Sequence, residues 1–223
     1  RGLVHSGIVV IERSTVEPTV GRAVLFDMDG VLVPTDRLKA EAHAATVRKF
    51  GGEVPAEFYR RHMGNSHQAV RAAFVAAAGV AADLDEYTKI YHDLYRELLR
   101  TQLEATPGAI ALLSRLSSIS YRLAVVTSSR SWMMDYVLER TAMRHFFEVL
   151  VSDEDISRPK PAPDAYLLAL QRLELSQSSA VVIEDSGPGV QAALAAGIPA
   201  LAVRTPFNVN HDFGNSNTTG VGS

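Results

Sequence analysis

Two aspartates and a glycine follow directly after a short apolar run near residue 25. The run covers residues 23–26, and Asp27, Asp29 and Gly30 come next. This pattern predicts a buried strand that delivers two carboxylates to a loop, where glycine lets the backbone turn without a clash. Two carboxylates could supply the nucleophile, the proton donor and part of the cation site that phosphoryl transfer needs. The same residue types also form ordinary turns and helix caps.

A second acidic pair favours the chemical interpretation over the turn. Glu184 and Asp185 follow another apolar run, at residues 180–183. Four carboxylates at one sheet edge would repel each other unless a cation lay among them. Hard oxygen ligands, in a chain without cysteine, favour magnesium. We therefore expect Mg2+ as the cofactor.

Three further polar residues stand where they could hold a phosphate. Thr127 and Ser128 follow the apolar run 123–126 and offer hydroxyl and backbone N–H donors, although they could equally form an ordinary helix cap. Lys160 lies between two prolines that stiffen its loop, so it could bridge phosphate and carboxylate. A single lysine is more commonly an exposed, solvated residue.

Short apolar runs alternate with helix-period segments over much of the chain, which predicts an α/β fold with a parallel sheet covered on both faces. The predicted strands are 23–26, 123–126, 149–151 and 180–183, and the predicted helices are 108–116, 131–140, 163–173 and 187–196. Each predicted strand ends in polar residues. Ligands of such sheets bind beyond the carboxyl ends of the strands, so these ends should converge on one crevice.

The alternation breaks in one long segment, which predicts a two-part organisation. Residues 35–105 show helical periodicity without a convincing strand, as expected for an inserted α-helical cap domain. We expect a Rossmann-like core formed by residues 21–34 and 106–223, and we treat residues 1–20 as an N-terminal extension. A Pro-Gly pair at 107–108 could serve as a hinge at the end of the insertion.

Composition and charge exclude several functional classes. Hydrophobic residues make up 47% and charged residues 21% of the 223 residues, as in soluble globular proteins. The net charge of -3 and the scattered basic residues argue against nucleic acid as a partner. Apolar stretches are too short for a membrane span or a signal peptide, so we expect a cytoplasmic protein. The sequence does not indicate an oligomeric state.

Four short motifs occur together in a particular order: 27–32 (DMDGVL), 126–128 (VTS), 160–161 (KP) and 182–186 (VIEDS). They resemble the four ordered motifs of the haloacid dehalogenase-like hydrolases, and the resemblance extends over roughly residues 22–205. The chain is similar in particular to the branch with a helical cap inserted after the first motif. That branch includes beta-phosphoglucomutase and many sugar-phosphate phosphatases.

The resemblance implies a role for each matching residue. Asp27 would be the nucleophile, and Asp29 would protonate the leaving group and then activate water. Thr127 and Lys160 would hold the phosphoryl oxygens. The presence of Asp29 also argues against halide removal, because a halide leaving group needs no proton whereas an alkoxide does.

The resemblance also implies how magnesium would be held. Its ligands would be the Asp27 carboxylate, the Asp29 backbone carbonyl and Asp185, with Glu184 in or beside the coordination shell. A small-molecule phosphate ester is the implied partner.

Substrate choice should depend on the cap. Residues 62–67 resemble the cap loop that reaches into the active site of related sugar-phosphate enzymes, although Ser66 could simply cap a helix. Lys39 is a further candidate, and its alternative is a solvated residue on a helix face. The predicted substrate-binding residues are Ser128, Lys39, Gly64, Asn65, Ser66 and His67.

Two departures from the resemblance separate a phosphatase from a mutase. Pro34 separately replaces an acidic residue common in the family and bears on the local hinge conformation. The two departures are Lys39, which stands where beta-phosphoglucomutase has a histidine, and His67, which stands where it has a phosphate-binding arginine. These changes favour a magnesium-dependent phosphatase that hydrolyses a small phosphorylated metabolite, such as a sugar phosphate, through an aspartyl-phosphate. The alternatives are a phosphosugar mutase and a phosphate-binding module with negligible turnover.

Overall fold

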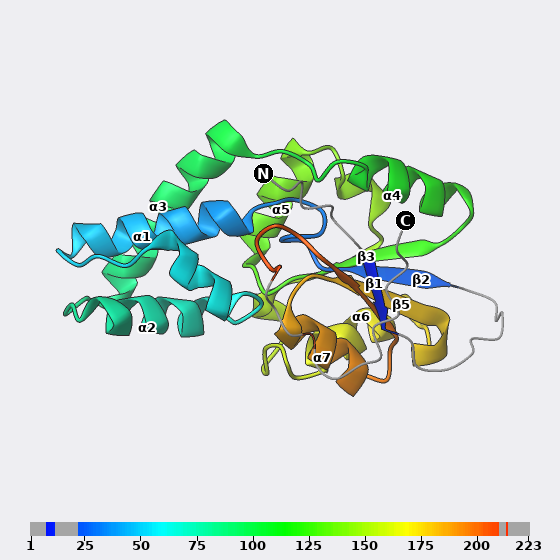
Figure 1. Cartoon of the computed structure of the whole chain (residues 1–223). Helices are drawn as coiled ribbons and strands as arrows, with labels where there is room; N and C mark the ends of the chain where they lie inside the picture. Colours follow the sequence, from blue (N-terminus) through cyan, green and yellow to red (C-terminus); the bar gives the residue numbers. More distant parts are fainter. Residues whose placement is uncertain (1–7, 12–21, 210–212, 214–223) are drawn as a thin grey trace.

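A six-stranded sheet forms the centre of the computed structural model, which describes residues 8–11, 22–209 and 213. The strand order is β1-β6-β5-β2-β3-β4, in which β6 to β4 run parallel and β1 pairs antiparallel with β6 (Figure 1). The strands are β1 (Ile8–Ile11), β2 (Ala23–Phe26), β3 (Arg122–Val126), β4 (Val149–Val151), β5 (Ala180–Glu184) and β6 (Ala200–Val203).

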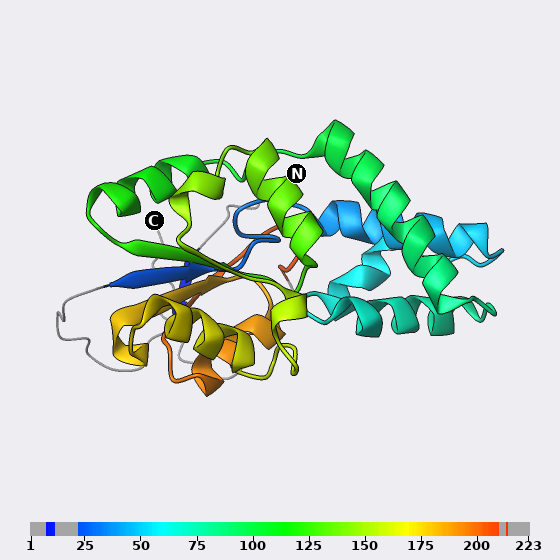
Figure 2. The same cartoon turned by 180° about the vertical axis from the view of Figure 1, so that it is seen from behind.

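Helices cover both faces of this sheet. The α-helices are α1 (Asp36–Lys49), α2 (His67–Ala78), α3 (Leu84–Gln102), α4 (Ala109–Ser118), α5 (Ser131–Arg140), α6 (Asp164–Leu173) and α7 (Gly187–Ala195). Short 3-10 helices are η1 (Ala56–His62), η2 (Arg144–Phe146), η3 (Asp153–Asp155) and η4 (Gln177–Ser179). Figures 1 and 2 show α4 and α5 on one face and α6 and α7 on the other. The predicted α/β fold with a parallel sheet is thus confirmed.

Strand β2 shows why the apolar run before Asp27 is continuous. Val24 and Phe26 pack into the cluster on the α4–α5 side, whereas Ala23 and Leu25 pack into the cluster on the α6–α7 side. A central strand of a parallel sheet is buried on both faces, so every position in it must be apolar. The first polar residue after the run therefore marks the sheet edge.

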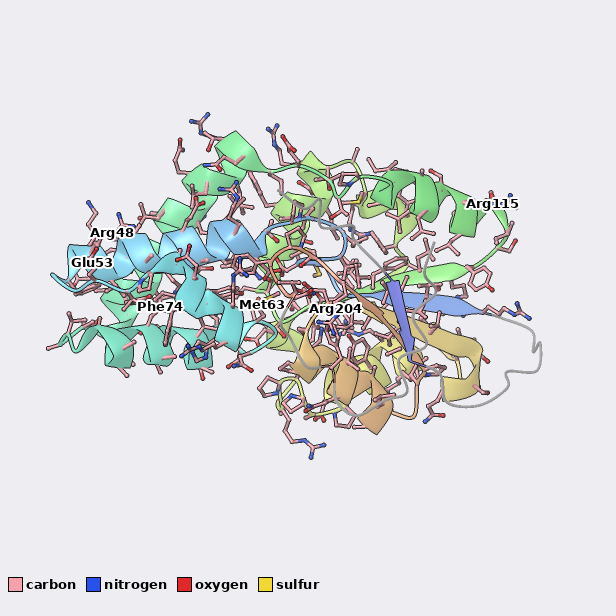
Figure 3. The ribbon with its side chains drawn as sticks, in the orientation of Figure 1. Arg48, Glu53, Met63, Phe74, Arg115 and Arg204 are labelled. Carbon is pink, nitrogen blue, oxygen red and sulfur yellow. The ribbon has the colours of Figure 1, made fainter. Side chains whose placement is uncertain are left out.

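The cap consists of α1, η1, α2 and α3, all inserted between β2 and β3. Helix α3 buries Tyr87, Tyr91, Tyr95 and Leu99, which recur every four residues and so line one face of the helix. Phe74 of α2 is completely buried and lies between α1 and α2 in Figure 3, where Met63 lies nearer to the core. These aromatic residues belong to the same hydrophobic cluster as Val24 and Phe26 of β2, so the cap packs continuously onto one face of the sheet.

The two chain crossings between core and cap lie side by side. The backbone N–H of Thr106 donates to the carbonyl of Leu32 at 2.8 Å, which joins the start of the insertion to its end. Gly108 follows with φ of +85°, a conformation that glycine adopts at little cost. The cap is therefore connected to the core through two adjacent segments.

Strand β1 lies within the segment 1–20 that we predicted as an extension, and it forms one edge of the sheet. The other residues of that segment, and the Asn- and Gly-rich end at 214–223, lie outside the described residues. Among the described helices, none combines the length and apolar character needed to cross a membrane.

Candidate active site

Asp27 is buried at the carboxyl end of β2, and a buried lysine binds it directly. Lys160 Nζ lies 2.7 Å from Asp27 Oδ1, 2.7 Å from Glu184 Oε1 and 3.0 Å from the carbonyl of Val126. These three acceptors use all three ammonium N–H groups. Burial raises the pKa of the Asp27 carboxyl, Lys160 opposes the rise, and the Glu184 and Asp29 carboxylates add to it. The net effect is a raised pKa, which further positive charge beside Asp27 would lower.

Asp29 is held by a different lysine. Lys39 Nζ, from α1, lies 2.6 Å from Asp29 Oδ2, and Ser129 Oγ donates to the same oxygen at 2.8 Å. Thr35 Oγ1 donates to Asp29 Oδ1. Burial alone would raise the pKa of Asp29, but Lys39 and these hydroxyl donors together hold it below its usual value. Asp29 is thus an ionised carboxylate in this conformation.

The pair at the end of β5 has two distinct environments. Glu184 is completely buried; Lys160 and Tyr166 donate to its Oε1, and the backbone N–H groups of Asp185 and Ser186 donate to its Oε2 at 2.8 and 2.9 Å. Asp185, by contrast, is 2% exposed, and its Oδ2 has no hydrogen-bond partner. Glu184 therefore orders the loop, while Asp185 offers an unused oxygen to the site.

The residues after β3 support Asp29. Thr127 Oγ1 accepts the N–H of Ser129 at 3.0 Å and lies 3.3 Å from Asp29 Oδ2, to which it donates. Thr127 and Ser129 are both buried. Ser128 faces the cap instead, where its Oγ donates to the carbonyl of Gly64 at 3.2 Å.

The donor set fits a divalent cation. One oxygen each from Asp27, Glu184 and Asp185 lies within 4.8 Å of the others, and all three residues are buried. Burial, followed by the charges of the neighbouring carboxylates, raises the pKa of Asp185 well above its usual value. A cation would remove this repulsion, and oxygen-only ligands suit magnesium-like ions. The orphaned Oδ2 of Asp185 is the atom that such an ion would satisfy.

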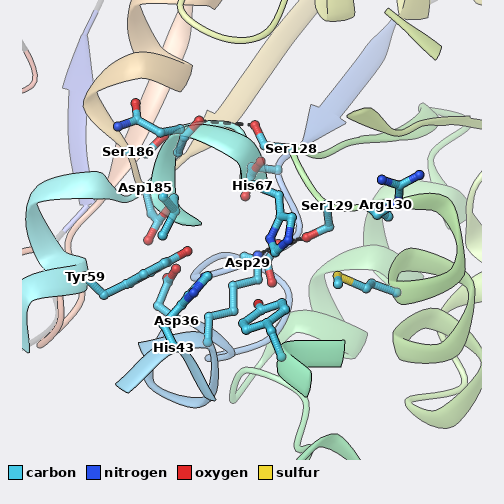
Figure 4. Close-up of a pocket in the computed structure, with 17 residues that line it drawn as sticks. Asp29, Asp36, His43, Tyr59, His67, Ser128, Ser129, Arg130, Asp185 and Ser186 are labelled. Atoms are coloured by element: carbon cyan, nitrogen blue, oxygen red, sulfur yellow. Dashed lines mark hydrogen bonds and ion pairs between the residues drawn. The ribbon is translucent and has the colours of Figure 1, made fainter. Parts of the chain in front are cut away.

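A small pocket connects these residues to the cap (Figure 4). Its floor includes Asp27, Asp29 and Asp185, and its cap wall includes Asn65 and His67. The cavity measures about 40 Å³, far below the roughly 300–1,000 Å³ usual for ligand pockets. In this conformation the pocket therefore has room for only a few atoms.

The cap loop is fitted closely to the core. Gly64 has φ of +77°, and a Cβ on it would lie only 2.4 Å from Ser186 Oγ. Ser66 lies at the start of α2 and accepts the N–H of Ala69 at 3.3 Å, so it caps the helix and is not among the residues that line the pocket. Burial, and after it the nearby basic groups, lower the pKa of His67 to about 3. His67 is thus a neutral imidazole.

Comparison with known proteins agrees with this arrangement. The profile of the haloacid dehalogenase-like hydrolases matches residues 24–203. The chain belongs to this family. It is 36% identical to hexitol phosphatase A of Escherichia coli over 83% of this chain and 84% of that protein. It is 32% identical to the phosphorylated carbohydrates phosphatase of Thermotoga maritima over 79% of this chain and 82% of that protein.

Solved structures show the same fold. The crystal structure of CbbY from Rhodobacter sphaeroides in complex with phosphate covers 89% of this chain and 92% of its own, with 24% identity and a TM-score of 0.78. The family resemblance predicted from the four motifs is therefore confirmed, and this haloacid dehalogenase-like hydrolase is an enzyme.

In this hydrolase the carboxyl ends of β2, β3 and β5 meet at the site, as predicted, but the end of β4 does not join them. Ser152 follows β4, and both its N–H and its hydroxyl bond to Asp155 at 2.8 Å in a local capping arrangement. Strand β4 is an edge strand, so its end lies away from the central strands. Lys160, Thr127 and Glu184 lie behind the pocket wall and do not line it.

Several residues of the site were not predicted from the sequence. Thr35, Asp36 and Ser129 lie around Asp29 and Asp185, and Asn208 Nδ2 donates to the Asp185 carbonyl at 2.7 Å. Thr35 and Asp36 resemble an ordinary helix start, and Ser129 resembles a loop serine. Only the position of Ser129 beside Thr127 and Ser128 could have indicated a role.

Proposed function

We propose that this hydrolase is a magnesium-dependent phosphatase acting on a small phosphate monoester, with a phosphorylated sugar or sugar alcohol as substrate. One observation carries the proposal: Asp27 and Asp29 lie at the floor of one pocket, and each is paired with its own largely buried lysine. Separate environments for two neighbouring carboxylates are what a division into nucleophile and acid/base requires. The names of the two curated relatives support the substrate class.

The first step uses Asp27 as the nucleophile. One of its carboxylate oxygens forms a bond to phosphorus while the bond from phosphorus to the leaving oxygen breaks. Asp29, once protonated, gives its proton to that leaving oxygen, and the alcohol departs. The product is an aspartyl-phosphate on Asp27.

The second step returns the enzyme to its starting state. Asp29, now ionised, removes a proton from a water molecule, and the water oxygen attacks the phosphorus as the bond to Asp27 breaks. The Lys39–Asp29 pair at 2.6 Å suits the start of this second step, because it keeps Asp29 unprotonated and so able to accept a proton. For the first step, Lys39 must turn toward the substrate phosphate so that Asp29 can take up a proton.

Magnesium would be held by the Asp27 carboxylate, the Asp29 carbonyl and Asp185. When bound, it would offset the negative charge of the phosphoryl group against the carboxylates. Lys160 would keep Asp27 oriented, and the cap loop with Asn65 and His67 would contact the rest of the substrate. A neutral His67 offers no second cation, which favours a monophosphate substrate over a bisphosphate intermediate.

The test is phosphate release from hexose phosphates, hexitol phosphates, phosphoglycolate and nucleotides, with and without magnesium. We expect release from the carbohydrate phosphates only when magnesium is present. Asp27→Asn should abolish release because an amide is a poor nucleophile, while Asp135→Asn, at an exposed position on α5, should retain it. Circular dichroism would verify that both variants are folded.

The outcomes separate the proposal from its alternatives. Product isomerisation without phosphate release would indicate a mutase. Tight binding of a phosphonate analogue with no turnover on any ester would indicate a binding module. Full activity in Asp27→Asn would refute the mechanism.

A further inference from the structure

The cation site lies among more buried negative charge than its lysines can balance. Five carboxylates and two lysines meet behind the cap loop, and every one of the five carboxylates is at most 7% exposed. The carboxylates are Asp27, Asp29, Asp36, Glu184 and Asp185, and the lysines are Lys39 and Lys160. Buried charges are costly unless each has a partner, so the pairing within this group is informative.

The two lysines form ion pairs with three of the carboxylates. Lys160 pairs with Asp27 and Glu184 at 2.7 Å each, and its third N–H goes to a backbone carbonyl. Lys39 pairs with Asp29 at 2.6 Å and donates to Ser129 Oγ at 2.9 Å. Glu184 is further satisfied by backbone N–H groups. The members of the group that form no ion pair with either lysine are Asp36 and Asp185.

These two carboxylates lie beside each other against Gly30. The position that a Cβ on Gly30 would take lies 1.9 Å from Asp185 Oδ2 and 2.8 Å from Asp36 Oδ2. Figure 4 shows both side chains on the same side of the pocket. Neither makes an ion pair with a lysine or arginine in the described part of the chain, and the buried Asp185 Oδ2 has no hydrogen-bond partner at all.

We propose that Asp36, the first residue of α1, belongs to the divalent cation site and helps Asp185 and Asp27 to hold the ion. The inference rests on the proposed magnesium dependence and adds a residue to the site. Two adjacent carboxylates that form no ion pair match the double charge of one such ion, whereas both oxygens of Glu184, the other acidic neighbour of Asp185, already accept hydrogen bonds.

A second cavity explains how the ion could keep part of its water on the Asp36 side. This cavity measures about 730 Å³ and is lined by Gly30, Asp36, Arg37 and Phe207, among others. Asp36 is the one aspartate that lines both this cavity and the substrate pocket in the described part of the chain. Magnesium gives up its water reluctantly and usually keeps several molecules, so a site with water on one side suits it.

The test measures magnesium binding without turnover. Isothermal titration of magnesium chloride would be compared for the wild type, Asp36→Asn and Asp85→Asn. Asp85 is exposed in the first turn of cap helix α3 and lines neither cavity, so its substitution makes the same chemical change outside the site. We expect Asp36→Asn to bind magnesium roughly 10-fold or more weakly, and Asp85→Asn to bind it like the wild type.

Thermal unfolding provides a second readout that also verifies folding. Asp36→Asn removes a repulsive charge, so without magnesium the variant should melt at or above the wild-type temperature. Its rise in melting temperature on adding magnesium should be smaller than in the wild type. Equal magnesium affinity in Asp36→Asn and wild type would overturn the role of Asp36 alone, whereas no binding by the wild type would overturn the proposed cation site as a whole.

Discussion

Lys39 and Asp29 form an ion pair that connects the cap to the catalytic loop. The ammonium group, carried by the cap helix α1, lies 2.6 Å from Asp29 Oδ2, and both side chains are about nine-tenths buried. Substrate phosphate would compete with Asp29 for this ammonium. On the proposed mechanism, the protonation state of Asp29 is therefore coupled to the presence of the substrate.

We expect Lys39→Met to destabilise the protein by about 3–5 kcal/mol at pH 7, because it leaves Asp29 charged and buried without its partner. In the wild type the lowered pKa of Asp29 contributes stability above about pH 3.9, the unfolded value, and this contribution is lost as the pH falls through the folded pKa. In the variant, burial raises the pKa of Asp29, and protonation relieves the penalty. The stability difference should therefore shrink between pH 7 and pH 4.

Urea denaturation at several pH values, without divalent cations, measures this difference. Lys49→Met is the matched control, since Lys49 is an exposed lysine in the last turn of the same helix. Its effect should stay within about 0.5 kcal/mol at each pH, as is usual for surface substitutions. A Lys39→Met penalty that does not vary with pH would contradict the proposed pairing.

Gly64→Ala should lower kcat/KM by roughly 10- to 100-fold while the protein stays folded, because misplacing a closing loop by about 1 Å can have such an effect. The added Cβ would lie 2.4 Å from Ser186 Oγ, so the cap loop could not reach its present position on the core. Gly79→Ala is the control: its φ is also positive, at +62°, but a Cβ there meets nothing within 4 Å. Steady-state kinetics would be measured on both variants. A loss of kcat/KM in Gly64→Ala but not in Gly79→Ala would show that the contact with Ser186, and not the positive φ, causes the effect.

Trp132 should report the position of the cap. It is the only tryptophan in the chain, and it lies on core helix α5 against two residues of cap helix α3. The His92 ring meets it edge-on at 5.3 Å, and the Arg96 guanidinium lies 4.3 Å from its ring centre. We expect the emission of Gly64→Ala to shift to longer wavelength as the cap opens. Unchanged emission in an impaired Gly64→Ala would show that the loss has another cause.

Asn208→Ala should weaken magnesium binding by about 10- to 100-fold, as is typical when a residue that orients a metal ligand is lost. The Asn208 amide donates to the carbonyls of Asp185 at 2.7 Å and Val203 at 2.9 Å, and so fixes the loop that carries Asp185. Titration calorimetry measures the affinity. Thr205→Val loosens the same turn but leaves this amide in place, so it should bind magnesium nearly as tightly as the wild type.

The strand ends were predictable because burial on both faces leaves a clear pattern. Apolar runs that stop at Asp27, Thr127 and Glu184 can only end at the sheet edge, and parallel strands bring these ends together. Asp36 and Thr35 could not be predicted in the same way. An acidic residue in the first turn of a helix has a sufficient local explanation in the helix dipole, and nothing in the spacing relates Asp36 to Asp185.

The role of Lys39 needed the folded chain as well. In the sequence, Lys39 is one of several charged residues in a predicted helix. Its ion pair with Asp29 depends on how α1 packs over the loop that follows β2, which the sequence pattern does not indicate. Strand β1 was missed for a similar reason, since its pairing with β6 spans nearly the whole chain. Contacts between distant segments leave little trace in local composition.

The antiparallel pairing of β1 with β6 has a consequence for the behaviour of the protein in concentrated solution. An uncovered outer strand presents a row of free N–H and C=O groups that a second chain can use to extend the sheet. β1 occupies this row on β6, from Ala200 to Val203. A variant lacking residues 1–21 could keep every group of the pocket and still gain a tendency to self-associate through β6.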